Sequence, residues 1–223
     1  MSQIEKNTVN AKGQLKKTEF VTFINPEGAG KRVMFVGNSI TRHGVLPEIG
    51  WNNDFGMAAS SVDNDYVHIV AKEYSNKNPD AAYCICQVAE WETQYKNGDK
   101  TLELFEMARN FDADIIIMRA VENCPATDFD EELFIEKYEE LISYLNPSKK
   151  AEVIVTTSFW KHKASDALCK IAEKNGYPLV KLEDLGEDES MKAIGLFKHS
   201  GVANHPGDKG MRTIAQRILQ KLI

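Results

Sequence analysis

Residues 32–37 read Arg-Val-Met-Phe-Val-Gly, a short apolar run that ends at a glycine. Such a run is typical of a strand that is buried on both faces of a parallel sheet. Four more strand-like runs follow it, at 82–88, 114–118, 152–157 and 179–182. Between and after them, apolar residues recur at helical spacing over 66–74, 101–111, 131–145, 165–174 and 207–222. This alternation predicts an α/β fold in which helices cover both faces of a parallel sheet of about five strands.

The chain has 223 residues, a length that suits one α/β domain. We expect residues 1–31 to be a partly loose lead-in segment with a short strand at 19–24, and residues 32–223 to be the folded domain. The formal net charge of −6 argues against nucleic acid as a partner, because that binding needs a basic surface. No apolar run is long enough to span a membrane. The N-terminus has no secretory signal as the chain stands, which predicts a cytoplasmic protein, or a secreted one if a signal was removed.

Three segments that follow predicted strands carry residues suited to nucleophilic catalysis. Ser39 follows the first strand, Asn123 follows the strand at 114–118, and His205 stands just before the last helix. In parallel sheets the chemistry lies beyond the carboxyl ends of the strands, so these side chains should converge. Singly, each is more often a turn or structural residue. Together they could supply a nucleophile, an oxyanion stabiliser and a general base, with His43 as a second candidate for the base.

At these residues the sequence resembles the SGNH (GDSL-type) hydrolases, in particular a bacterial subgroup. The matching blocks are Val36–Thr41 (VGNSIT), Gly56, Glu122-Asn123, and 205–210 (HPGDKG). The resemblance spans residues 32–223 and implies a flavodoxin-like three-layer α/β/α sandwich with esterase chemistry. It implies Ser39 as nucleophile and His205 as base. It also implies an oxyanion hole built from the Ser39 and Gly56 N–H groups and the Asn123 side chain.

The sequence departs from the family pattern at three positions. Asn38 replaces the usual aspartate of the serine block, and Val121 replaces a glycine. More seriously, Val202 stands where the family usually places the aspartate that orients the histidine. Asp208 and Glu122 are possible substitutes, although Asp208 also suits a helix N-terminus. We expect a backbone carbonyl or a water molecule to orient His205, which gives a Ser-His dyad.

All three tryptophans, Trp51, Trp91 and Trp160, fall in segments that follow predicted strands. Tryptophans often fill gaps against the core, but their flat rings also suit the apolar faces of sugars. Together with Arg42 they are the candidate substrate-binding residues. They favour a small-molecule or carbohydrate ester, with an O-acetyl sugar as the leading substrate.

Serine chemistry needs no cofactor and no metal site is predicted, while the oligomeric state stays open. Two alternatives remain: a non-catalytic carbohydrate-binding module on the same fold, and an O-acyltransferase.

Overall fold

The computed structural model of the protein describes residues 19–97 and 99–222. Most of the lead-in segment predicted to be partly loose, residues 1–18 of 1–31, lies outside these ranges. The strands are β1 (Val21–Ile24), β2 (Arg32–Gly37), β3 (Ala82–Gln87), β4 (Ile115–Arg119), β5 (Glu152–Thr156) and β6 (Leu179–Val180). The α-helices are α1 (Tyr66–Ser75), α2 (Ala89–Gln94), α3 (Glu106–Phe111), α4 (Glu131–Leu145), α5 (Ser165–Asn175), α6 (Ser200–Ala203) and α7 (Asp208–Leu222). Short 3-10 turns join several of them.

The strands form one six-stranded sheet in the order β1-β3-β2-β4-β5-β6. All neighbouring pairs are parallel except β1 and β3, which are antiparallel. The first parallel strand along the chain, β2, lies inside the parallel part of the sheet, with β3 added on one side of it and β4, β5 and β6 on the other. The order therefore reverses between β2 and β4, and such a reversal is where doubly wound folds bind their ligands.

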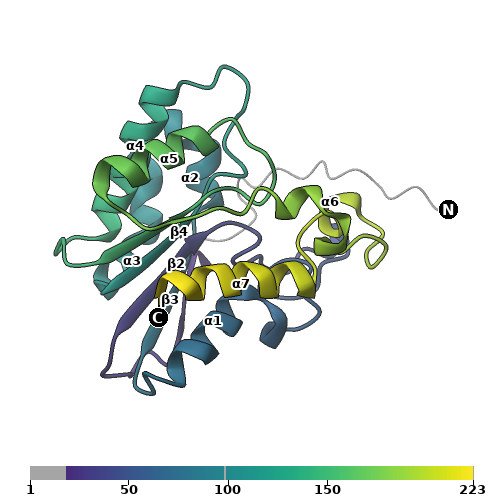
Figure 1. The fold of residues 1–223 in the computed structure, drawn as a ribbon, viewed down its shortest axis with the longest axis horizontal. Coiled ribbons are helices and arrows are strands. Elements are labelled where there is room, and N and C mark those ends of the chain that lie inside the picture. Colours follow the sequence, from purple (N-terminus) through teal and green to yellow (C-terminus); the bar gives the residue numbers. More distant parts are fainter. Residues whose placement is uncertain (1–18, 98, 223) are drawn as a thin grey trace.

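Each face of the sheet is covered by its own group of helices (Figure 1). Alternate residues of β2 divide between two apolar clusters, with Met34 and Val36 on one side and Val33 and Phe35 on the other. The first cluster continues into α2, α3, α4 and α5, whereas the second continues into α1 and α7. This three-layer arrangement confirms the predicted fold class. It also explains why the strands read as continuous apolar runs, since neither face meets water.

Two details differ from the sequence-based expectation. The lead-in segment contributes a strand of the sheet, because β1 pairs along its whole length with β3, from Val21 opposite Cys86 to Ile24 opposite Tyr83. The sheet therefore has six strands. The helix expected over 101–111 is broken into a 3-10 stretch, Asp99–Phe105, and the α-helix α3.

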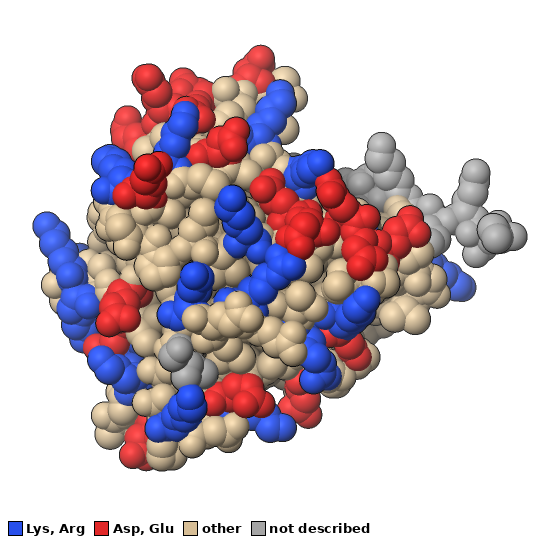
Figure 2. Space-filling model, viewed as in Figure 1, with Lys and Arg blue, Asp and Glu red and all other residues tan. Residues whose placement is uncertain are grey.

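Positive and negative side chains are interspersed over the face of the molecule shown in Figure 2. Ion pairs such as those of Lys174 with Glu139 and Arg217 with Asp184 join neighbouring elements at the surface. Within residues 19–97 and 99–222, every helix is too short or too polar to cross a bilayer.

Candidate active site

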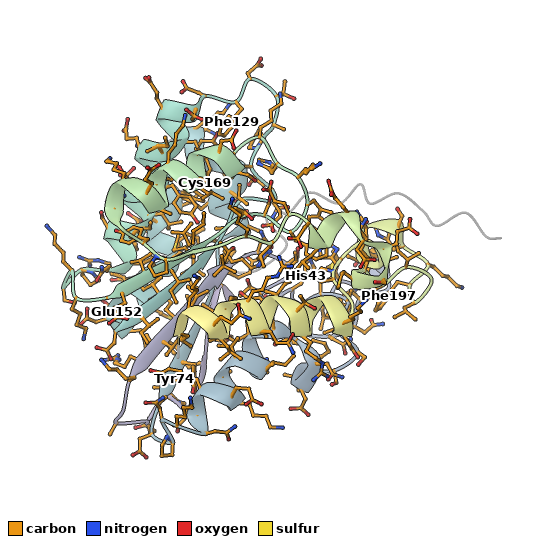
Figure 3. All side chains as sticks on the ribbon, in the orientation of Figure 1. His43, Tyr74, Phe129, Glu152, Cys169 and Phe197 are labelled. Atoms are coloured by element: carbon orange, nitrogen blue, oxygen red, sulfur yellow. The ribbon has the colours of Figure 1, made fainter. Side chains whose placement is uncertain are left out.

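Ser39, Asn123 and His205 all lie at the carboxyl end of the sheet. Figure 3 gives the orientation: Glu152, the first residue of β5, lies at one end of the sheet, and His43 lies beyond the other end. Gly37 ends β2 where the chain must turn sharply. A Cβ there would lie 2.0 Å from the Thr41 hydroxyl oxygen and 2.9 Å from the Arg119 carbonyl oxygen. Only glycine fits this turn, which presents the half-buried Ser39 between β2 and β4.

Ser39 and His205 are in direct contact, although 166 positions separate them in the sequence. The Ser39 Oγ lies 2.8 Å from the His205 Nε2. The backbone around His205 is held by the hydrogen bond from the Ala193 N–H to the His205 carbonyl, at 2.9 Å. This is the hydrogen-bonded pair that an activated serine nucleophile requires.

The other ring nitrogen of His205 lies 2.6 Å from the Gly201 carbonyl oxygen. Gly201 belongs to the four-residue helix α6, and its carbonyl accepts no backbone N–H among the described residues. Because a carbonyl oxygen only accepts, the proton of the neutral ring must sit on Nδ1. The Nε2 lone pair then faces the Ser39 hydroxyl, as a general base requires.

Burial lowers the pKa of His205 to about 4, and the Gly201 contact opposes this shift only in part. The nearby charges of His43 and Arg119 lower it further. The ring is therefore neutral at pH 7. His43, the rival candidate for the base, is also buried, and its Nδ1 lies 2.6 Å from the Gly44 carbonyl oxygen.

Neither carboxylate considered as a substitute for the missing aspartate contacts His205. Asp208 accepts hydrogen bonds from the N–H and the hydroxyl of Ser60, at 2.8 and 2.6 Å. Glu122 pairs with Arg119 at 2.9 Å and accepts from the Phe159 N–H. Position 202 itself is part of a small apolar cluster with Ile49, Trp51, Met57, Ala58 and Ala193. Neither of these two possible substitutes therefore contacts the ring, whose Nδ1 instead meets a backbone carbonyl, as we expected.

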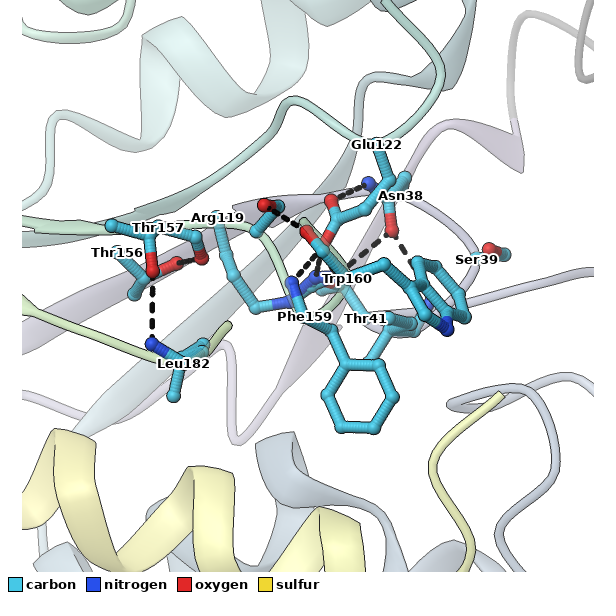
Figure 4. A network of polar contacts seen from close by, with 12 residues as sticks. Asn38, Ser39, Thr41, Arg119, Glu122, Thr156, Thr157, Phe159, Trp160 and Leu182 are labelled. Carbon is cyan, nitrogen blue, oxygen red and sulfur yellow. Dashed lines mark hydrogen bonds and ion pairs between the residues drawn. The ribbon is translucent and has the colours of Figure 1, made fainter. Parts of the chain in front are cut away.

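Two carboxylates instead support the asparagine side of the serine. Asn38 donates both amide hydrogens, one to Glu92 at 2.8 Å and one to Glu122. Its carbonyl oxygen accepts from Arg119 at 3.1 Å, a contact visible in Figure 4. Asn123 donates to the second oxygen of Glu92. Glu92, which the sequence analysis did not single out, therefore joins the loop after β2 to the loop after β4.

The expected oxyanion donors differ in their availability. The Gly56 N–H donates to the Asp65 carboxylate at 3.1 Å, so it is not free for a substrate oxygen, contrary to expectation. The Ser39 and Ala58 N–H groups have no acceptor among the described residues. Ala58 follows Met57, whose N–H donates to the Ser39 carbonyl at 2.9 Å, and it adopts a left-handed φ of 74°. The sequence signal for Ala58 was only its place two residues beyond the expected glycine.

Three of the four expected substrate-binding residues are structural. The Trp51 ring is fully buried and its indole N–H donates to the His43 carbonyl. Trp91 packs in the core against Tyr95 and Tyr138. The buried Arg42 pairs with Asp54 at 2.8 Å and donates to the Glu19 carbonyl. Trp51 is covered because the loop after β2 packs against itself and against residues 193–202. Trp91 is covered because α2 packs it into the main core on that face of the sheet.

Trp160 differs from the other two tryptophans because it lies against the histidine. Its ring meets that of His205 edge to face, with centroids 5.3 Å apart and planes at 85°. Its indole nitrogen is buried without a hydrogen-bond partner. Within the described ranges, no group of three or more His, Cys, Asp or Glu residues could hold a metal ion.

No family model matches the chain, and no curated protein matches it in sequence. Solved structures do share its fold. A two-domain esterase (CEX) active on acetylated mannans, co-crystallised with mannopentaose, is 18% identical with a TM-score of 0.56, over 89% of this chain and 50% of that one. The psychrotrophic esterase EstA from Pseudoalteromonas sp., inhibited by monoethylphosphonate, is 11% identical with a TM-score of 0.54, over 86% of this chain and 96% of that one.

A protein from Parabacteroides merdae described as a GDSL-like lipase is 12% identical with a TM-score of 0.55, over 86% of this chain and 94% of its own. The chain spans about half the length of the mannan esterase. Two of these structural neighbours are described as esterases and one as a GDSL-like lipase. At such identities, what this chain shares with them is the fold.

Proposed function

We propose that the protein is a serine esterase of the SGNH type that hydrolyses short acyl esters. The observation that carries the proposal is the 2.8 Å contact between Ser39 Oγ and His205 Nε2, with the ring proton held on Nδ1 by the Gly201 carbonyl. A non-catalytic binding module has no need for a neutral histidine aligned on a serine hydroxyl in this way.

In the proposed reaction, the Ser39 hydroxyl oxygen bonds to the acyl carbon while its proton passes to His205 Nε2. The electron pair of the ester carbonyl moves onto its oxygen. When the tetrahedral intermediate collapses, the bond to the alcohol oxygen breaks and that oxygen takes the proton from Nε2. Water then attacks the acyl-enzyme with the same proton transfers, which releases the acid and restores Ser39.

The negative oxygen of the intermediate needs donors that are already in place. The candidates are the free N–H groups of Ser39 and Ala58, together with the Asn123 amide, which is anchored by Glu92. During proton transfer the imidazolium is stabilised by the Gly201 carbonyl, a neutral group. This makes the centre a Ser-His dyad.

We further propose an acetyl ester of a carbohydrate as the substrate. Trp160 supports this, because its aromatic ring lies directly beside His205, where the leaving alcohol must receive its proton. The mannan esterase that shares the fold acts on an acetylated polysaccharide, which is consistent with this substrate class. An acceptor alcohol in place of water would make the same site an O-acyltransferase.

Replacement of Ser39 by alanine tests the nucleophile. We expect Ser39→Ala to lower kcat for p-nitrophenyl acetate by about 10⁴-fold or more, with unchanged circular dichroism, because no acyl-enzyme can form. An activated ethylphosphonate ester should add to the peptide that contains Ser39 in the wild type and not in the variant. An alanine variant that keeps most of the activity would remove Ser39 as the nucleophile.

The acyl preference tests the substrate class. We expect kcat/KM for acetate esters to exceed that for octanoate esters by about tenfold or more, as a site specific for acetyl esters requires. Product analysis with an acetylated oligosaccharide should show free acetate. Transfer of the acetyl group to an added sugar would favour the acyltransferase, and a preference for octanoate would favour a lipase.

A further inference from the structure

The carboxyl group of Glu92 is completely buried at the carboxyl end of the sheet. It comes from α2, the short helix that follows β3, and it bridges two amides. One oxygen accepts from Asn38, the residue before the serine, and the other accepts from Asn123. The carboxyl group itself takes no proton and forms no bond in the proposed reaction, and glutamate side chains are rarely buried completely unless they are paired.

The two amides are held very differently. Asn38 is fixed at four points, because its nitrogen also donates to Glu122 and its oxygen accepts from Arg119 and from the Ile40 N–H. For Asn123, Glu92 is the single side-chain hydrogen-bond partner among the described residues. A change in the Glu92 carboxyl group therefore acts on Asn123, which is free to rotate, before it acts on Asn38.

An amide nitrogen has two hydrogens, and a carboxylate that takes one of them fixes the direction of the other. Both Glu92 oxygens must be acceptors for this, because each one faces an NH2 group. We infer that Glu92 is a positioning residue for the esterase proposed above: its carboxylate holds the Asn123 amide with the nitrogen turned toward Ser39, ready to stabilise the oxyanion. The inference rests on that proposed function.

The electrostatics of the cluster agree with this geometry. Burial and the neighbouring charge of Glu122 raise the pKa of Glu92 to about 7, while the amides of Asn38 and Asn123 and the charge of Arg119 lower it. Glutamine has the shape of the protonated acid, and it places an NH2 group where Asn38 or Asn123 needs an acceptor. Glu92→Gln therefore breaks one of the two contacts while the side chain keeps its volume.

The experiment is a double-mutant cycle on p-nitrophenyl acetate hydrolysis with Glu92→Gln, Asn123→Ala and the double variant. We expect each single variant to lower kcat by about 10²-fold, the typical loss of one oxyanion donor, with KM changed less than threefold. The double variant should be no slower than Asn123→Ala alone, because Glu92 acts through Asn123. Glu136→Gln, an exposed position on α4, is the matched control and should keep the wild-type kcat.

Glu92→Asp is a second variant that keeps the charge but is one methylene too short to reach both amides. It should lose kcat in the same way while thermal unfolding stays cooperative. An active wild type with a normal Glu92→Gln kcat would overturn the positioning role, and so would losses that multiply in the double variant. A wild type without Ser39-dependent hydrolysis would overturn the esterase itself and the inference with it, so the two failures are distinguishable.

Discussion

The two sides of Ser39 are supported in opposite ways. On one side, the ring nitrogen Nδ1 of His205 meets a neutral backbone carbonyl, that of Gly201, and the residue at position 202 is a buried valine. On the other side, Asn38 and Asn123 are held by two buried carboxylates, Glu92 and Glu122, with one arginine between them. In a catalytic triad a carboxylate contacts the histidine, whereas here the carboxylates contact the asparagines.

The two sides differ in how strongly they stabilise the charges that form during catalysis. A carbonyl fixes the tautomer of a histidine but stabilises the imidazolium less than a carboxylate does. An amide anchored on a carboxylate is, in turn, a well-fixed donor. We therefore expect catalysis by this protein to depend more heavily on the oxyanion side than catalysis by a complete triad does.

The largest expected effect comes from removal of the histidine. We expect His205→Ala to lower kcat for p-nitrophenyl acetate by about 10⁴-fold, because among residues 19–97 and 99–222 His205 is the one side chain hydrogen-bonded to Ser39 Oγ and able to take its proton. Steady-state kinetics at pH 8 give the measurement. Asp208→Asn is the control for the dyad and should change kcat less than threefold, since Asp208 bonds to Ser60. If the two variants lose similar activity, the dyad interpretation fails.

An intermediate effect is expected in the pH dependence of kcat. His205 acts as a base only when neutral, so activity should rise as pH increases through about 4. Glu92 holds Asn123 only when ionised, so a second rise, of about 10²-fold, should follow as pH increases through about 7. Glu92→Gln should keep the lower step and lose the upper one.

Other titratable groups lie near Glu92, and each must be considered as a possible source of the upper step. Burial raises the pKa values of the Cys124 thiol and the Tyr138 phenol, so both stay neutral near pH 7. Glu122 forms an ion pair with Arg119 at 2.9 Å. If Glu92→Gln retains both steps, the upper step belongs to another group, and the pH profile gives no support to the role of Glu92.

The smallest expected effect on kcat comes from the family's usual aspartate. Val202→Asp should not raise kcat, because residue 202 is buried among Trp51, Met57 and their neighbours. The free energy of unfolding should fall by about 3 kcal/mol, since a carboxyl group there has no partner. Urea denaturation and ester hydrolysis measure the two quantities. A faster enzyme with undiminished stability would show that the carboxylate reaches His205.

The sheet and the proximity of Ser39 and His205 could be predicted from the sequence, whereas the contacts that surround these two residues could not. The helix expected over 131–145 is α4 with the same bounds, because its apolar spacing is regular and Asp130 caps its first turn. The buried positions of Trp51 and Arg42 were not predicted because residues 38–65 pack against segments distant in the sequence, such as residues 193–202, and such contacts leave no periodic pattern.

Glu92 was missed for a related reason. In the sequence of α2, Ala-Glu-Trp-Glu-Thr-Gln, two acidic residues sit in the first turn, and nothing local tells which one turns inward. That choice is made by the asparagines of two other loops, through contacts that span 54 and 31 positions. Long-range polar contacts of this kind leave no periodicity in a single sequence.

The left-handed backbone of Ala58 has a consequence for how the protein could be improved. An alanine at a φ of 74° carries a conformational cost of about 1 kcal/mol, and the surrounding contacts of the loop hold it there. Its neighbour Met57 is hydrogen-bonded to the Ser39 carbonyl, so the strained turn and the serine share one segment. A substitution that removes this strain at Ala58 would therefore be an obvious way to raise the thermal stability. It would also alter the loop segment that contacts Ser39, so we expect the gain in stability to come with a loss of turnover.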